Sequence, residues 1–207
     1  MEIVFGRCWK CYIKLIRRLI NEKDLMLLAT FLSTLFYSAS YPLIYKEITM
    51  TVTTSMISLN QIFNCISIVL FSSLWNKRGD NLFKFYPLLL LLECLCCISV
   101  TIYTILTGNI IGYYILDTLM ICCITRNIIC GGNKLRAKRY NSEKERETFD
   151  NNNNSASAIA TIIGSLIAII LKLDINSMLI IATIGNSIDN ILYALCFREE
   201  AKRNLNN

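Results

Sequence analysis

Three acidic side chains lie inside long apolar segments of this chain, where an ionised carboxylate is costly. Glu93 and Asp117 are the only charged residues between Phe85 and Thr125, and Asp189 lies in the last apolar segment. A charge at the centre of a membrane costs at least about 2.5–3.5 kcal/mol on insertion scales, so such residues usually face a cavity or a partner. We name Glu93 and Asp117 as candidate sites for a proton or a cation. A structural, hydrogen-bonded carboxylate is the open alternative.

A second polar set lies in the second apolar segment. Asn60 and Asn64 are four residues apart and share a helix face, and Gln61 adjoins that face. Such amides line a solute cavity or bind neighbouring helices, and we favour the cavity. Tyr37 and Tyr41 in the first apolar segment are placed along the same space. The alternative for these tyrosines is the ordinary aromatic belt at a membrane interface.

One basic residue, Arg126, falls within an apolar segment at a depth similar to that of Asp189. A buried cation and a buried carboxylate at one depth neutralise each other when they meet. We therefore predict a structural ion pair between these two residues.

Small residues recur at every fourth position late in the chain. This spacing lines one face of a helix and lets two backbones approach closely, which drives helix association in lipid. We expect a packing face made of Ala156, Ala160, Gly164 and Ala168.

These residues are best positioned by a bundle of membrane-spanning helices. Hydrophobic residues make up 54% of the 207 residues and charged residues only 17%, against roughly 25% charged residues in soluble domains. A helix needs about 20 apolar residues to cross the hydrocarbon core. The apolar segments predict an all-α membrane protein with six spans, at about 25–45, 51–74, 85–105, 110–129, 155–171 and 175–197. A tight loop at 76–81 is expected between the second and third spans, and a long loop at about 131–153 between the fourth and fifth.

The distribution of basic residues predicts the orientation. Of the 21 Lys and Arg residues, all but Lys46 and Lys172 fall on one side of this topology, and that side is the cytoplasm by the positive-inside rule. Both termini are then cytoplasmic in a multi-pass protein of the cell membrane. Residues 1–23 are expected to form a basic amphipathic segment on the inner leaflet, and 198–207 a polar tail. The net charge of +6 is explained by these anchors beside anionic lipid, so we expect no nucleic-acid partner.

The sequence gives little support for catalysis or metal binding. It contains no histidine, the commonest metal ligand and proton shuttle, and we expect no metal and no cofactor. Cys8 and Cys11 have the spacing of zinc and redox sites, but no second pair accompanies them. We expect no enzymatic activity. The alternative is an intramembrane aspartyl protease that uses Asp117 and Asp189.

The junction between the second and third spans, residues 72–81, resembles the loop signature of the major facilitator superfamily, Gly-x-x-x-Asp-Arg-x-Gly-Arg-Arg. Gly79 matches the central glycine, and Lys77 replaces the arginine. Asn76 is the neutral isostere of the aspartate, and Asp80 reverses the charge of the next base. In that family the loop is a latch at the inner face that favours the outward-facing state.

Other positions agree with this resemblance, which covers residues 24–197. Arg126 stands where that family has a span-four arginine, and Gly164 falls in the fifth span. The resemblance implies a bundle of three plus three helices, like one half of a major facilitator fold. It also implies secondary transport of a small solute driven by an ion gradient.

A full member of that family has twelve spans, and its two halves rock against each other around a midplane site. We therefore expect a half-size or amino-terminal half-transporter, completed by a second copy or by a separately encoded half. The alternative is the six-helix substrate-binding membrane subunit of an energy-coupling-factor importer, which would work with an ATPase partner.

Overall fold

The computed structural model describes residues 24–140, 142–171 and 173–205, and these ranges are almost entirely helical and contain no strand. The predicted amphipathic segment 1–23, with Cys8 and Cys11, lies outside the described residues. A short 3₁₀ turn, η1 (Phe83–Phe85), precedes α4, and a π-helical segment, η2 (Ile121–Thr125), joins α5 to α6 in one continuous span. The α-helices are α2 (Leu25–Thr51), α3 (Thr54–Leu82), α4 (Tyr86–Thr107), α5 (Ile110–Met120), α6 (Arg126–Arg139), α7 (Glu143–Leu171) and α8 (Ile175–Leu205).

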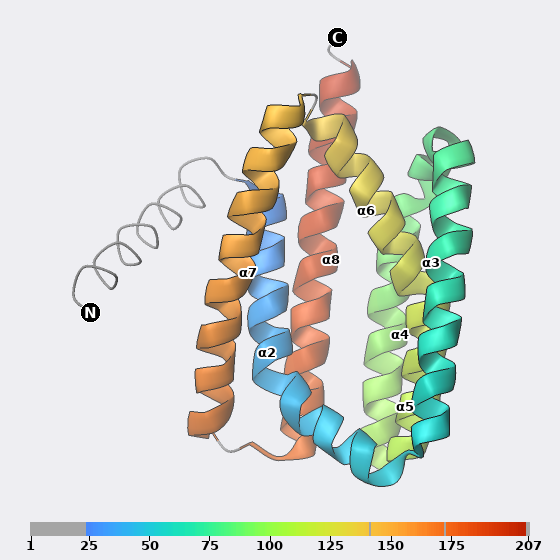
Figure 1. The fold of residues 1–207 in the computed structure, drawn as a ribbon, viewed down its shortest axis with the longest axis vertical. Helices are drawn as coiled ribbons and strands as arrows, with labels where there is room; N and C mark the ends of the chain where they lie inside the picture. Colours follow the sequence, from blue (N-terminus) through green and yellow to red (C-terminus); the bar gives the residue numbers. More distant parts are fainter. Residues whose placement is uncertain (1–23, 141, 172, 206–207) are drawn as a thin grey trace, which may run out of the picture.

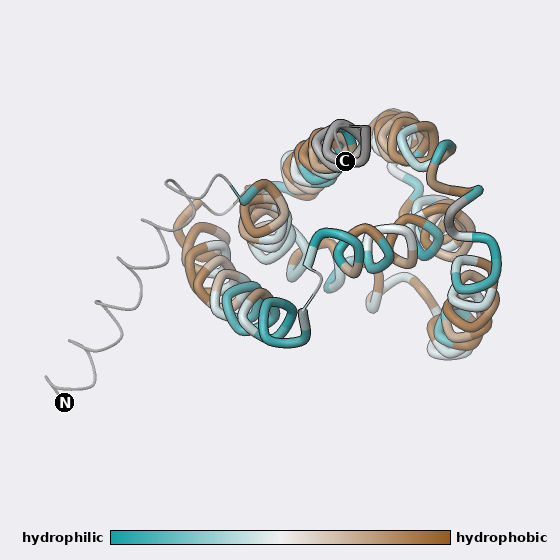
Figure 2. The backbone as a smooth tube through the Cα atoms, turned by 90° about the horizontal axis from the view of Figure 1, so that it is seen from above, coloured by the Kyte–Doolittle hydropathy of each residue, from teal (hydrophilic) through white to brown (hydrophobic). Residues whose placement is uncertain are grey.

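Within the described residues, six helical units are long and apolar enough to cross a membrane. They hold 24–30 residues each, so at 1.5 Å per residue they measure about 36–45 Å and exceed a hydrocarbon core of about 30 Å. Large apolar side chains point outward: Val69 is 69% exposed, Leu106 78% and Ile170 73%. Figure 2 shows hydrophilic residues gathered at the helix ends nearest the viewer, with apolar residues along the helix bodies. The prediction of an all-α chain with six helices able to cross a membrane is confirmed for the described part.

The helices run alternately up and down and form two groups (Figure 1). The first group holds α2, α7 and α8, because α2 packs closely against both α7 and α8. The second holds α3, α4 and the α5–η2–α6 span, through contacts of α3 with α6 and of α4 with α5. Contacts of α4 with α8 and of α2 with α5 join the two groups into one bundle.

The helices extend beyond the predicted spans. α2 contains Pro42, bends in its lower half in Figure 1, and continues through Lys46 and Glu47. α3 continues to Leu82, so residues 76–81, predicted as a tight loop, are helical. The described residues of the long loop predicted at 131–153 are also helical apart from Tyr140 and Ser142, and α8 runs through most of the predicted tail. Hydropathy marks the membrane-embedded part of a helix, whereas backbone hydrogen bonding continues until a turn residue interrupts it.

Capping residues set the ends of several helices. The Asp24 carboxylate accepts a 3.2 Å hydrogen bond from the Met26 amide at the start of α2. Gly108 ends α4 in the left-handed conformation, with φ 65°, which glycine adopts without steric cost. Before α8, the Asp174 carboxylate accepts a hydrogen bond from the Ser177 hydroxyl, and this bond lowers the pKa of Asp174.

The small-residue face of α7 packs against α2. Ala156 and Ala160 are fully buried, Gly164 is buried and Ala168 is half-buried. A Cβ atom on Gly164 would lie only 2.5 Å from the carbonyl oxygen of Leu35. The two backbones approach so closely that only glycine fits at this crossing.

An aromatic core closes the end of the bundle at which α3 meets α4. The Trp75 ring meets Phe83 edge-on at 5.5 Å between centroids and Tyr86 at 6.0 Å. Phe197 of α8 stacks on Phe83. The Trp75 indole donates a 2.6 Å hydrogen bond to the Asn127 side chain of α6. Four spans are thereby joined at this end.

Candidate functional site

Glu93 is the centre of a polar site inside the bundle. It lies in the middle of α4 and is only 2% exposed. Its carboxylate accepts a 2.5 Å hydrogen bond from the Thr125 hydroxyl and a second from the Asn190 side chain of α8. Thr125 is the last residue of η2, and single π-helical turns occur frequently at functional sites. One carboxylate therefore joins the third, fourth and sixth spans.

Both intramembrane aspartates interact with this glutamate. Asp117 of α5 and Asp189 of α8 each interact electrostatically with Glu93. Ser33 of α2 interacts with the Asp189 carboxyl, whereas the Oδ1 atom of Asp189 is buried without a hydrogen-bond partner. Within the described residues, the Asp117 carboxyl accepts no hydrogen bond and none of the three acids forms an ion pair. The described residues contain no group of three His, Cys, Asp or Glu side chains that could hold a metal ion.

A polar seam runs along the contact of α4 with α8, and sequence reasoning missed it. Thr101 and Thr183 share a 2.5 Å hydrogen bond between their hydroxyls. One turn further along, the Asn186 amide donates to the Cys97 sulfur at 2.8 Å. The signal was present in the sequence: residues 93, 97 and 101 on one helix and 183, 186 and 190 on the other each follow helical spacing.

The predicted ion pair between Arg126 and Asp189 is not seen among the described residues. The Arg126 Nε atom instead donates a 2.5 Å hydrogen bond to the Asn64 side chain of α3. The π-helical segment explains the difference, because its i to i+5 hydrogen bonds change the rotational phase of the residues that follow. Arg126 is thereby turned towards the second span, whereas the neighbouring Thr125 faces Glu93.

The remaining predicted pathway residues lie nearer the surface of the isolated chain. The Asn60 side-chain oxygen is buried without a partner, and Gln61 beside it is exposed. Tyr37 is 54% exposed and stacks on Tyr41 with 4.4 Å between ring centroids. Both tyrosines interact electrostatically with Asp117. The structure thus brings Tyr37 and Asp117 together from different spans.

The residues that resemble the family loop signature lie on the last turns of α3. Asn76 and Lys77 are exposed, and Asp80 is helical. Gly79 is buried beneath the Lys134 side chain of α6, whose Cε atom would lie 3.1 Å from an added Cβ. The loop predicted for this motif is therefore incorrect, but the glycine does permit a close crossing of the second and fourth spans.

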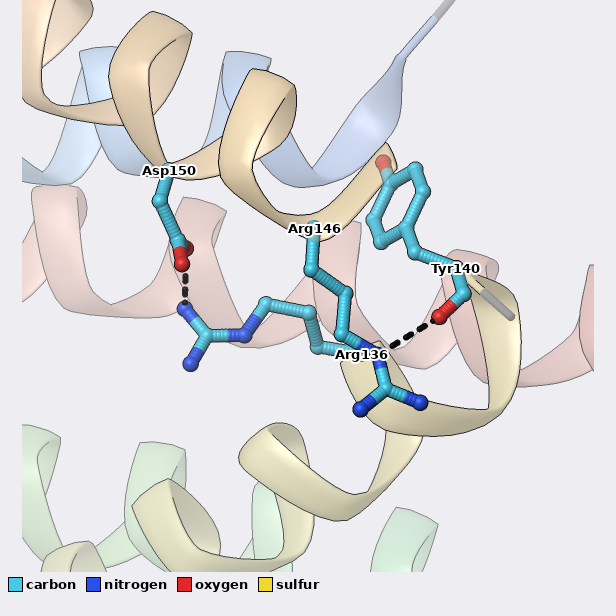
Figure 3. Close-up of polar contacts among 4 residues, drawn as sticks. All are labelled: Arg136, Tyr140, Arg146 and Asp150. Carbon is cyan, nitrogen blue, oxygen red and sulfur yellow. Dashed lines mark hydrogen bonds and ion pairs between the residues drawn. The ribbon is translucent and has the colours of Figure 1, made fainter. Parts of the chain in front are cut away.

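A polar clasp holds the turn between α6 and α7 (Figure 3). Arg136 forms a 3.0 Å ion pair with Asp150, and Arg146 donates a 2.8 Å hydrogen bond to the carbonyl oxygen of Tyr140. The Tyr140 hydroxyl donates to Asp24 at 2.7 Å, and burial together with this bond raises the pKa of Tyr140. A pocket of about 660 Å³ opens beside this turn, and none of the predicted site residues lines it.

No family model, no curated protein and no solved structure matches this chain. The function must therefore be argued from the site.

Proposed function

We propose that this chain is one half of a secondary transporter of the major facilitator type, which carries a small solute at the expense of a proton or cation gradient. The observation that carries the proposal is the interaction of Glu93 with both Asp117 and Asp189 inside an apolar bundle. Ionisable residues within spans mark ion pathways and proton relays by default. The absence of an ion pair for these carboxylates within the described chain leaves them available to a mobile cation.

The pattern of helix neighbours supports inverted three-helix repeats. Suppose that the first span is exchanged with the fourth, the second with the fifth and the third with the sixth. The contacts of α2 with α7 and α8 then become contacts of the α5–η2–α6 span with α3 and α4, and these contacts are also present. The contacts of α4 with α8 and of α2 with α5 are unchanged by this exchange. Because each repeat has an odd number of spans, the second enters the membrane from the opposite side. Inverted repeats of this kind are typical of secondary transporters.

Polar groups exposed in the middle of the spans support a second unit. Tyr37 lies near the middle of α2 and Gln61 well inside α3, and both are exposed in the isolated chain. Hydrocarbon does not solvate amide and hydroxyl groups, so these surfaces are better covered by water or protein. In the proposed assembly, a second copy or a separately encoded half faces them across an aqueous cavity. The basic helix ends then lie in the cytoplasm of a cell-membrane protein.

An aspartyl protease is the less favoured reading of the same acids. Its two aspartates must share one proton around the attacking water. Here the acidic partner of each aspartate is Glu93 and not the other aspartate, so the two do not form the pair that a protease needs.

The test is gradient-driven uptake. Amines, sugars, amino acids and carboxylates are screened for thermal stabilisation of the purified protein, and stabilising solutes are offered in labelled form to proteoliposomes. We expect an inward proton or sodium gradient to increase uptake, and Glu93→Gln to remove that increase. Glu47→Gln, at the far end of α2, is the matched control and should retain it. The proposal is contradicted if no solute stabilises or enters, or if Glu93→Gln keeps the gradient dependence.

A further inference from the structure

We propose that Asp117, Tyr37 and Tyr41 form a binding site for a monovalent organic cation, such as a quaternary ammonium or a protonated amine. Its role as the solute site rests on the proposed transport function, and its role as a binding site does not. The site takes residues from two spans that the fold brings together, α2 and α5.

The carboxyl of Asp117 is the anionic group of this site. It lies seven residues inside α5, and no hydrogen bond to it occurs within the described chain. Its titratable neighbour Glu93 is also an acid, not a base. The nearest basic residue along the same span, Arg126, is held by Asn64 through a 2.5 Å hydrogen bond. The local charge therefore favours a positive ligand.

Aromatic rings supply the other wall. Tyr37 and Tyr41 stack at 4.4 Å, and Tyr45 continues the row at 5.7 Å from Tyr41. All three lie on one face of α2, because they are spaced by four residues. Aromatic faces attract cations, and cages of such rings recognise quaternary ammonium groups. Tyr113 of α5 also interacts with both Asp117 and this row.

The exposure of the rings provides access. Tyr37 is 54% exposed and Tyr41 37%, whereas Asp117 is partly buried. The rings are thus the more accessible part of the proposed site, and the carboxyl is the more enclosed part. A small metal ion needs several oxygen, nitrogen or sulfur ligands rather than aromatic rings. The described residues contain no group of three His, Cys, Asp or Glu side chains that could supply them.

The test compares two probes of equal shape and different charge. Choline and its neutral isostere 3,3-dimethylbutan-1-ol are titrated calorimetrically into the purified chain in a detergent that lacks choline headgroups. We expect choline to bind and the neutral isostere to bind more than about tenfold more weakly. This comparison needs no variant and remains decisive if a substitution prevents folding. Equal binding of the two probes, or binding of neither, would overturn the proposal.

Variants then locate the site. Asp117→Asn should weaken choline binding more than about tenfold, whereas Asp174→Asn, a matched change in the α7–α8 turn, should leave it unchanged. Tyr37→Ala should weaken it about 2- to 30-fold, and Tyr37→Phe, which keeps the ring, should not. Unchanged affinity in Asp117→Asn would refute the site. Choline binding without uptake of any solute would refute the transport function alone, and gradient-driven uptake of a neutral solute without choline binding would refute the cation site alone.

Discussion

The Thr125 hydroxyl donates a 2.5 Å hydrogen bond to the Glu93 carboxylate and so connects the only π-helical segment of the described chain to the middle of α4. The Arg126 amide bonds to the Ile121 carbonyl oxygen at the end of this segment. The wider π turn thus places Thr125 towards Glu93 and Arg126 towards α3. A local change of helix type separates the intramembrane base from the intramembrane acids.

Loss of the Thr125 hydroxyl should destabilise the bundle. Thr125→Val leaves a buried carboxylate without one of its two donors, and we expect the free energy of unfolding to fall by about 1–2 kcal/mol. Thermal unfolding in detergent measures the change. Thr125→Ser keeps the donor and serves as control, so equal stability of the two variants would show that the hydrogen bond contributes nothing.

The seam between α4 and α8 should show pairwise coupling. Thr101→Val, Thr183→Val and the double variant form a double-mutant cycle around the 2.5 Å hydroxyl contact. We expect a coupling free energy of about 0.6 kcal/mol, with an upper range near 1.7 kcal/mol, as found for hydrogen bonds between membrane helices. If the stability losses of the two single variants simply add up in the double variant, the two hydroxyls do not interact.

A larger residue at position 164 should separate α7 from α2. Gly164→Val places methyl groups where a Cβ alone would already lie 2.5 Å from the Leu35 carbonyl oxygen. We expect a loss of about 1–3 kcal/mol, the usual effect of overpacking, measured by thermal unfolding. Ala158→Val is the matched control on the exposed face of the same helix and should cost much less. The packing assignment fails if both variants are equally stable.

The two ends of α7 should lie on opposite sides of the membrane. Lys144 in the first turn of α7 and Asn176 at the start of α8 are both exposed. In a background without native cysteines, Asn176→Cys should react with an impermeant maleimide in intact cells, and Lys144→Cys only after permeabilisation. Reaction of both from one side would exclude a membrane-spanning α7, and the reverse pattern would invert the orientation.

The sequence was sufficient to predict the number of spans, because apolar segments of about 20 residues are a requirement of the hydrocarbon core. It did not predict where the helices end. Residues 76–81 and 131–139 are mostly polar or glycine and were assigned to loops, yet they continue the helices. A single glycine such as Gly79 costs a helix only about 1 kcal/mol relative to alanine and does not stop it.

The acids of the site were recognisable from their burial in apolar segments, but their partners were not. Depth along a span can be read from the sequence, whereas the direction of a side chain around the helix depends on packing and on irregular turns. Arg126 and Asp189 were expected at one depth, yet Arg126 bonds to Asn64 and Asp189 interacts with Glu93 and Ser33. The π-helical segment η2, which changes the phase between α5 and α6, accounts for this difference. Thr125 could be chosen as the partner of Glu93 only once this segment was known.

The central claim is that this bundle lines an aqueous pathway rather than standing in lipid on all sides. Gln61→Cys on α3 and Ile98→Cys on α4 place exposed thiols well inside their spans, and both are made without the native cysteines. We expect the thiol at position 61 to react with a charged, impermeant thiosulfonate from each side of sealed vesicles, and that at position 98 to stay unreactive in hydrocarbon. If position 61 is as unreactive as position 98 from both sides, that face is covered by lipid and the proposed transport pathway does not exist.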